Sequence, residues 1–381
     1  MKRRTALTAA GAGVLGLGAA AAATPALAET LGDDARRHSK RGFVRGADIS
    51  GLIKNEDFGA VYRRADGRRG DAVKILAENG IDCIRAKVWV DPADGYNTKT
   101  QVVELGKRAK RAGMDLLVDF HYSDTWADPG KQYKPAAWTA MSFADLKTAV
   151  YEHTADVLGA LKDAGVKPGL VQVGNETNGG LIWPDGRWDQ LEQMAELLTA
   201  GCDAVADVLP KAQTILHLAE GGNSGAFQWF FDNAVANGVP FHAIGASFYP
   251  YWHGELSGLA ANLNDLATRY GKPLYVVETA YPFTTGDSDG FANIVTDPEP
   301  VAGFPSSPEN QSYWIEAIAD VVKAVPNGLG KGLFWWEATW TGVAGAGWDP
   351  ADPASGNGWE NQALFDFDGK ALPGLRTLGS L

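Results

Sequence analysis

Residues 170–176 read Leu-Val-Gln-Val-Gly-Asn-Glu, an apolar run that ends in an amide and a carboxylate. Residues 274–278 read Leu-Tyr-Val-Val-Glu and also end in a carboxylate. Runs of this kind are typical of strands buried on both faces of a parallel sheet. Polar residues that follow such strands lie at the edge of the sheet where ligands bind. The two stretches therefore predict a parallel α/β sheet that carries Glu176 and Glu278 on one rim.

Similar apolar runs alternate with amphipathic helical stretches along the rest of the chain. The predicted strands are Phe43–Asp48, Ile81–Val88, Met114–Phe120, Leu170–Gly174, Gln213–Leu218, Ala243–Phe248, Leu274–Glu278 and Gly332–Glu337. The predicted helices are Arg69–Asn79, Thr100–Ala112, Phe143–Ala164, Trp188–Val208, Phe227–Asn237, Leu256–Tyr270 and Glu309–Ala324. This alternation predicts one (β/α)8 TIM barrel with long βα loops as a single domain, residues 43–381. An open doubly wound sheet is the alternative, although its usual glycine-rich first turn is not evident.

The composition narrows the class of function. The chain has 381 residues, 46 acidic and 34 basic side chains and a formal net charge of −12, which argues against nucleic-acid binding. A hydrophobic content of 45% excludes a disordered chain. Thirteen Trp residues fit either a well-filled core or a groove that stacks on sugar rings. We expect a monomer whose partner is a polysaccharide.

The first 28 residues have the pattern of an export signal. Lys2–Arg4 are basic, residues 9–23 are rich in Ala and Gly, and Ala26–Ala28 form a small-x-small cleavage site. The Arg3-Arg4 pair favours a twin-arginine signal, with a general secretory signal as the alternative. The apolar run is too short for a permanent span, so we expect a secreted protein without a membrane anchor.

A polar leader is predicted to follow at residues 29–42. Cys83 lies in a predicted strand and Cys202 in a predicted helix. Two buried thiols are the favoured interpretation, and one disulfide remains the alternative because export exposes the chain to oxidants.

Two carboxylates that face each other across a cleft are what glycoside hydrolysis needs. One must be protonated to give its proton to the leaving oxygen, and the other must be ionised to attack or stabilise the sugar cation. A separation of about 5–5.5 Å predicts retention of the anomeric configuration. The alternative is that Glu176 and Glu278 only pair with rim arginines or end their strands. Catalysis is the favoured interpretation because both follow apolar strands and Asn175 precedes Glu176.

Other rim residues support a sugar-binding cleft. The predicted substrate-binding residues are Arg85, His121, Asp124, Trp126, Asn175, Trp183, Tyr249 and Trp336. Arg85 either keeps a nucleophilic carboxylate ionised or forms a structural ion pair. His121 either orients a carboxylate or a sugar hydroxyl, or is a satisfied core imidazole. Tyr249 is placed to hydrogen-bond the nucleophile.

The tryptophans differ in the position that the sequence gives them. We expect Trp336 to form the floor under a sugar ring and its neighbour Trp335 to point into the core. Trp126 and Trp183 lie in predicted loops, where sugar stacking explains them better than burial. Glu337 is a third rim carboxylate, and it ranks below the other two because it follows two Trp residues rather than an apolar strand end.

Residues 287–293 read Asp-Ser-Asp-Gly-Phe-Ala-Asn and place oxygen atoms at alternate positions. Asp287, Asp289, the Phe291 carbonyl and Asn293 resemble positions 1, 3, 5 and 7 of a calcium loop. The downstream bidentate Glu of an EF-hand is absent, so further ligands must come from elsewhere. We expect a structural calcium ion here, with a solvated turn as the alternative.

Several strings together resemble glycoside hydrolase family 53, the arabinogalactan endo-β-1,4-galactanases. They are Gly46–Ser50, Arg85–Trp89, Asp119–Gln132, Val171–Glu176 and Gly356–Gln362. The long string at residues 119–132 is highly specific, whereas an Asn-Glu pair is shared by many barrel glycosidases. The resemblance extends from about residue 43 to the end of the chain.

The resemblance implies a (β/α)8 barrel that hydrolyses β-1,4-galactan, the side chain of type I arabinogalactan, with retention. It implies that Glu176 is the acid/base and Glu278 the nucleophile of a double displacement, and that calcium binds in the loop of residues 287–293. Thr177 and the Ala86-Lys87 pair depart from the usual pattern, which bears on subsite detail only. The alternatives are another barrel endo-glycanase, acting on β-1,4-glucan or mannan, and a non-catalytic carbohydrate-binding barrel.

Overall fold

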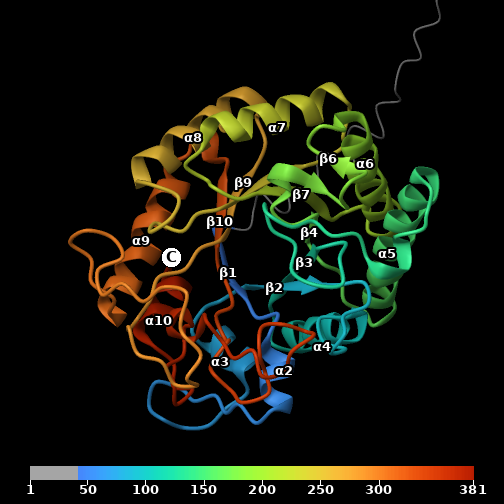
Figure 1. Ribbon diagram of the computed structural model, residues 1–381. Helices are drawn as coiled ribbons and strands as arrows, with labels where there is room; N and C mark the ends of the chain where they lie inside the picture. The colour runs from blue at the N-terminus through green and yellow to red at the C-terminus, as the bar shows by residue number, and fades with distance from the viewer. Residues whose placement is uncertain (1–41) are drawn as a thin grey trace, which may run out of the picture. The chain divides into compact units, whose positions relative to one another are not determined.

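The computed structural model describes residues 42–381, which fall in one compact unit (Figure 1). The predicted export signal and all but the last residue of the predicted leader lie outside the described residues. Eight strands form a closed barrel in the order β1-β10-β9-β8-β7-β4-β3-β2. Their bounds are β1 Val44–Asp48, β2 Cys83–Val88, β3 Asp115–Phe120, β4 Leu170–Val173, β7 Gln213–Leu218, β8 Ala243–Ser247, β9 Leu274–Glu278 and β10 Gly330–Trp335. Every neighbouring pair is parallel, so the prediction of a (β/α)8 barrel is confirmed.

Helices surround the strands, as Figure 1 shows. They are α2 Leu52–Asp57, α3 Ala72–Glu78, α4 Lys99–Arg111, α5 Phe143–Asp163, α6 Leu191–Val208, α7 Ser224–Ala236, α8 Leu256–Tyr270, α9 Pro308–Lys323 and α10 Pro373–Ser380. Four 3₁₀ turns, Ala136–Trp138, Thr177–Gly179, Pro326–Gly328 and Glu360–Gln362, lie in the connections. The seven predicted helices are confirmed, whereas α2 and α10, of six and eight residues, were not predicted.

Local sequence signals explain where several helices begin and end. Ser142 and Ser307 accept hydrogen bonds from the backbone N–H groups three residues on, which caps α5 and α9. Gly113 and Gly165 follow α4 and α5 with φ of 77° and 72°, a conformation that costs other residues energy. These caps let each chain segment turn back toward the next strand.

The barrel closes where β1 lies between β2 and β10. Gly46 is required there, because a Cβ atom at this position would lie 2.0 Å from the ring of Phe334. The interior of the barrel is filled by one small apolar cluster: Cys83, Leu117, Leu170, Ile215, Ala243, Tyr275, Val277 and Phe334. A larger apolar core lies between the outer faces of the strands and the helices. The interior is thus packed, and the space for a ligand lies at the rim.

Cys83 belongs to the barrel interior and Cys202 to the outer core on α6. They form no disulfide, which agrees with the favoured interpretation of two buried thiols. A short antiparallel hairpin, β5 Gly180–Leu181 and β6 Gly186–Arg187, follows β4. Within residues 42–381, no helix is long and apolar enough to cross a membrane.

Candidate active site

Glu176 and Glu278 open into one cavity of about 600 Å³ at the carboxyl ends of the strands. Glu278 is the last residue of β9, and Glu176 lies three residues beyond β4. Because parallel strands present their carboxyl ends on the same rim, strands far apart in the sequence bring the two groups together. The position that the sequence predicts for both residues is therefore the one observed.

Glu176 sits in an environment that favours the protonated acid. Its backbone has a φ of 45°, a left-handed conformation that is uncommon for residues other than glycine. Ser247 donates a hydrogen bond of 2.6 Å to Oε1 of the carboxyl group. Burial and the nearby charge of Glu278 raise the pKa of Glu176 well above its ordinary value. This carboxyl group can therefore hold a proton at neutral pH.

Glu278 sits in an environment that favours the carboxylate. Nη2 of Arg85 lies 2.7 Å from Oε1, and the Tyr249 hydroxyl donates to Oε2 at 3.0 Å. Burial raises the pKa of Glu278 to about 7, with the Arg85 charge acting in the opposite direction. The ion pair makes Glu278 the ionised member of the pair, since Glu176 has no such direct cation contact among the described residues. Different surroundings thus favour a protonated Glu176 and an ionised Glu278.

Arg85 is shared among several acceptors. Nη1 contacts Asp48 at 2.7 Å, and Nη2 contacts Asp119 and the side-chain oxygen of Asn175, both at 2.9 Å. One buried guanidinium therefore faces three carboxylates, counting Glu278. Arg85 both contacts the candidate nucleophile and holds together the structural ion pairs inside the barrel, so the two interpretations of its role are combined.

Asn175 and His121 line the cavity beside the carboxylates. The Asn175 amide donates to the Ala127 carbonyl at 2.8 Å. Nδ1 of His121 accepts from the Ala127 N–H at 3.1 Å, and Nε2 lies 3.0 Å from Asp119. Burial lowers the pKa of His121, so the ring is neutral. Both residues fix the loop that follows β3 against the cavity.

Aromatic rings form much of the cavity wall. Trp126 and Trp336 line it, as the sequence predicts, with ring centroids 5.8 Å apart. Trp336 also packs edge-on against Trp359 at 4.6 Å. Further lining rings are Trp252, from the loop after β8, and Trp340 and Trp348, from the connection after β10 that also carries Trp336. Indole faces suit the CH faces of sugar rings, so this wall fits a carbohydrate. Trp335 is buried in the core, as expected.

Three predicted substrate-binding residues do not line this cavity: Asp124, Trp183 and Arg85, the last of which is buried behind Glu278. Asp124 accepts hydrogen bonds from the backbone N–H groups of Asp91 and Ala136, at 3.0 and 2.8 Å. Trp183 donates from its ring nitrogen to the Gly179 carbonyl at 2.7 Å. Asp124 and Trp183 therefore stabilise loops around the cavity through these hydrogen bonds.

Glu337 is also absent from the cavity lining formed by the described residues. It is buried, lies 2.7 Å from Nζ of Lys87 and accepts the N–H of Gly51 at 3.1 Å. Its lower rank in the sequence prediction is consistent with this enclosed ion pair.

Sequence reasoning missed residues whose role depends on which strands are neighbours. Asp48 is the last residue of β1, Asp119 is the next to last of β3, and His217 lies within the otherwise mostly apolar β7. The signal available was a polar residue inside an otherwise apolar strand. Trp252 carries no local signal, and Trp359, although part of the Gly356–Gln362 string, was given no role because loop conformation brings it to the cavity.

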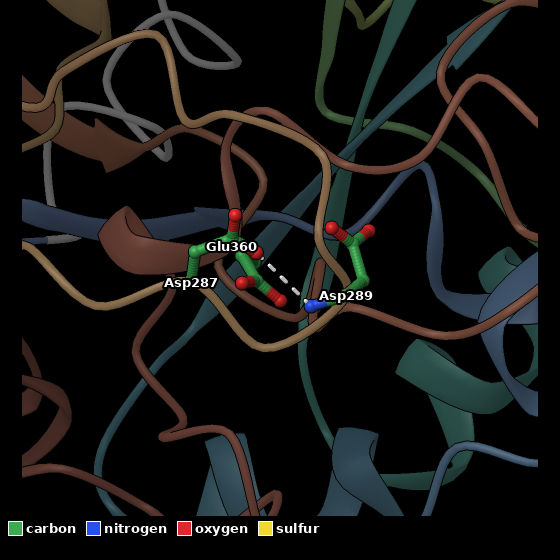
Figure 2. Close-up of side chains that lie close together, drawn as sticks. All are labelled: Asp287, Asp289 and Glu360. Atoms are coloured by element: carbon green, nitrogen blue, oxygen red, sulfur yellow. Dashed lines mark hydrogen bonds between the residues drawn. The ribbon is translucent and has the colours of Figure 1, made fainter.

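The predicted calcium loop brings two of its four predicted residues together. Asp287, Asp289 and Glu360 each offer a carboxylate oxygen, and these atoms lie within 4.8 Å of one another (Figure 2). Burial raises the pKa of Glu360, and the two aspartates raise it further. Glu360 lies 72 residues beyond Ser288 and accepts a hydrogen bond from its backbone N–H, so no local pattern pointed to Glu360 as a ligand. Among residues 42–381 no basic side chain forms a salt bridge with these three carboxylates, and such a group suits a hard divalent ion.

Asn293 adds an independent reason to consider this loop as an ion site. Its side-chain nitrogen donates to the Gly286 carbonyl at 2.9 Å, while its side-chain oxygen is buried without a hydrogen-bond partner. A cation ligated by that oxygen would satisfy it. Phe291 has no ligand atom in its side chain, so only its carbonyl could bind the ion. The residues present therefore fit calcium.

Comparison with known proteins agrees with this geometry. The profile of glycosyl hydrolase family 53 matches residues 44–378. An endo-β-1,4-galactanase from Bacillus subtilis (strain 168) is 35% identical, over 88% of this chain and 85% of that protein. An arabinogalactan endo-β-1,4-galactanase from Thermothelomyces thermophilus is 34% identical, over 87% of this chain and 97% of that protein.

Solved structures give the same result. The GH53 catalytic domain from Ignisphaera aggregans superposes with a TM-score of 0.84 at 38% identity, covering 88% of this chain and 95% of that one. A fungal β-1,4-galactanase superposes with a TM-score of 0.78 at 34% identity, covering 89% and 99%. The recognition made from the sequence is confirmed: this chain belongs to glycosyl hydrolase family 53.

Proposed function

We propose that this protein is an endo-hydrolase of β-1,4-galactosidic bonds in galactan and that it works with retention of configuration. The observation that carries the proposal is the contrast between two carboxyl groups in one cavity: Glu278 pairs with Arg85, and Glu176 does not. The names of the Bacillus subtilis and Thermothelomyces thermophilus relatives support galactan as the substrate.

In the first step, Glu278 attacks the anomeric carbon while Glu176 gives its proton to the departing glycosidic oxygen. The C–O bond to the leaving sugar breaks as the bond from carbon to the Glu278 oxygen forms. Arg85 and Tyr249 hold the attacking carboxylate in its ionised form through contacts of 2.7 and 3.0 Å. The product of this step is a galactosyl-enzyme and a shortened chain.

In the second step, Glu176, now ionised, takes a proton from water as the water oxygen attacks the same carbon. The bond to Glu278 breaks, and Glu278 returns to the carboxylate form. Two displacements at one carbon restore the β configuration. Proton NMR of the first product from galactan tests this: the β anomer is expected, and initial release of the α anomer would refute retention.

The substrate we favour is the galactan of type I arabinogalactan, bound along the tryptophan rings that line the cavity, among them Trp126 and Trp336. Release of reducing sugar from debranched galactan, compared with cellulose and β-1,4-mannan, tests the choice. Strong release from galactan alone is expected, whereas preference for either other polymer would favour another endo-glycanase. Binding to galactan without release of oligosaccharides would favour a non-catalytic barrel.

We assign calcium a structural role in the loop of residues 287–293. Asp287, Asp289, Glu360 and the side-chain oxygen of Asn293 would hold it, together with the Phe291 carbonyl. Bound calcium would neutralise the carboxylates and link the loops after β9 and β10. Chelation with EGTA should lower the melting temperature by several degrees, and added calcium should restore it. An Asp289→Asn variant serves as the matched control, since EGTA should change its melting temperature far less. A wild-type melting temperature that EGTA leaves unchanged would refute the assignment.

Export is supported by the sequence pattern of the first 28 residues alone. Expression with these residues in a bacterial host should yield protein in the medium that begins at Glu29. Retention of the uncleaved chain in the cells would contradict this, and dependence on the twin-arginine translocase would separate the two export routes.

A further inference from the structure

His217 is a buried residue of β7 that is linked to the candidate acid Glu176 once directly and once through Ser247. Its Nδ1 accepts the backbone N–H of Glu176 at 3.3 Å. Its Nε2 lies 2.9 Å from the hydroxyl of Ser247, and that hydroxyl lies 2.6 Å from Oε1 of Glu176. The ring itself does not line the cavity formed by the described residues. His217 is therefore connected to both the backbone and the carboxyl group of one residue without being able to touch substrate.

The donors around the ring fix the position of its hydrogen atom. A backbone N–H can only donate, so Nδ1 must offer a lone pair to Glu176. The side-chain amide of Gln172 lies 2.9 Å from Nδ1 and supplies a second donor. Burial and the charge of Arg85 hold the pKa of His217 well below its ordinary value, so the ring is neutral. The single ring hydrogen is therefore on Nε2, facing Ser247.

The direction of the remaining hydrogen bonds follows. Ser247 accepts from Nε2 of His217, so its own hydrogen is donated to Oε1 of Glu176. The side-chain oxygen of Asn175 lies 3.1 Å from Nδ1 of His217, and both atoms are acceptors. The Gln172 amide lies 3.0 Å from that oxygen and donates a hydrogen between the two acceptors. One arrangement of hydrogen atoms therefore gives each of these side chains a hydrogen-bond partner.

We propose that His217 and Ser247 are positioning residues that keep Oε1 of Glu176 as a hydrogen-bond acceptor and so place the catalytic proton on Oε2. The inference rests on the proposed function, in which Glu176 is the acid/base. With Oε1 occupied by a donor, a proton on that oxygen would face the Ser247 hydrogen, so Oε2 is the oxygen that protonates the glycosidic bond. The Nδ1 contact also holds the N–H of Glu176, whose backbone is left-handed, while Gln132 donates to the Glu176 carbonyl at 3.3 Å.

Charged groups on several elements act on the hydrogen-bonded residues Glu176 and His217. Glu278, Asp128 and Arg85 act on Glu176, while Asp119, His121 and Arg85 act on His217. The Ser247 hydrogen bond lowers the pKa of Glu176 and opposes the effects of burial and of Glu278. Removing that hydroxyl should therefore raise the pKa of Glu176, whereas the other charges stay in place.

The test compares a Ser247→Ala variant with the wild type on two substrates. On galactan, whose leaving sugar needs a proton, kcat/KM should fall by about 10- to 100-fold. On a dinitrophenyl β-galactobioside, whose leaving group departs without a proton, kcat/KM should change by less than about threefold. The basic limb of the galactan pH profile should move to higher pH, since that limb reports loss of the Glu176 proton.

β7, which carries His217, and β8, which carries Ser247, offer a matched control at their opposite ends. The hydroxyl of Thr214 on β7 bonds the ring of His242 at 2.8 Å, just before β8 begins. A Thr214→Val variant removes a similar hydroxyl–imidazole bond far from the cavity, so it should leave the substrate ratio and the pH profile unchanged. A His217→Gln variant provides a second route to the result if Ser247→Ala does not fold.

The outcomes separate this inference from the function on which it rests. Equal losses on both substrates, an unmoved basic limb, or full activity of Ser247→Ala on galactan would each overturn the positioning role. Full activity of Glu176→Ala on galactan would instead overturn the assignment of Glu176 as the acid. A selective loss on galactan with a shifted basic limb would support the inference.

Discussion

Two buried carboxylates stand at the ends of neighbouring strands, and each is paired with a cation from β2. Glu278 at the end of β9 contacts Arg85, and Glu337 just after β10 contacts Lys87, both at 2.7 Å. Lys87 also lies 4.0 Å above the ring of Trp126. By residue type and pairing alone, the two sites look alike.

They differ in access and in how the cation is shared. Glu278 lines the cavity, and its Arg85 is divided among three carboxylates. Glu337 lies outside the cavity lining, has Lys87 as its salt-bridge partner and accepts the Gly51 N–H. A carboxylate that is incompletely neutralised and open to a ligand can attack, whereas one that is enclosed with its own cation stabilises the rim.

The largest contrast should appear in activity. Glu278→Gln should lower kcat on galactan by about 10³-fold or more, because a neutral amide replaces the attacking carboxylate. Glu337→Gln should lower it by less than about tenfold, measured well below the melting temperature of the variant. Similar losses in the two variants would show that the enclosed carboxylate also takes part in the chemistry.

In stability, Glu337→Gln should have a larger effect than Glu278→Gln. Glu337→Gln leaves Lys87 buried without its partner, which should reduce the free energy of unfolding by about 3 kcal/mol in urea titrations. Adding Lys87→Met to Glu337→Gln removes the uncompensated charge and should recover part of the loss. A double variant as unstable as the single one would contradict the ion-pair explanation.

The sharing of Arg85 can be tested by removing one competitor. Asp48 raises the pKa of Glu278, so Asp48→Asn should lower it. Because Glu278 must be ionised to attack, the acid limb of kcat/KM, expected near pH 7 in the wild type, should move to lower pH. Movement to higher pH would mean that Asp48 holds Arg85 in place rather than competing for it.

A smaller change in the opposite direction should follow from Tyr249→Phe. The Tyr249 hydroxyl lowers the pKa of Glu278 by donating to the carboxylate, so its loss should raise that pKa. The acid limb should then move to higher pH, while the basic limb stays near its wild-type position. An unmoved acid limb would show that this hydrogen bond does not tune the nucleophile.

The sequence was sufficient for the elements that follow from local pattern. Apolar runs that end in polar residues predicted the barrel and the shared rim of Glu176 and Glu278. It was not sufficient for contacts set by strand neighbours: Asp48 and Asp119 became partners of Arg85 only when the barrel closed. Glu360 likewise reaches the loop of Asp287 through the fold of two long connections, which no local period encodes.

The most direct test of the opposed roles of Glu176 and Glu278 uses azide with a dinitrophenyl β-galactobioside. In Glu176→Ala, azide should replace water in the second step and give the β-glycosyl azide. In Glu278→Ala, azide should attack directly from the vacated face and give the α-glycosyl azide. Proton NMR distinguishes the products, and an exchange of the two configurations between the variants would contradict the assignment of acid/base and nucleophile.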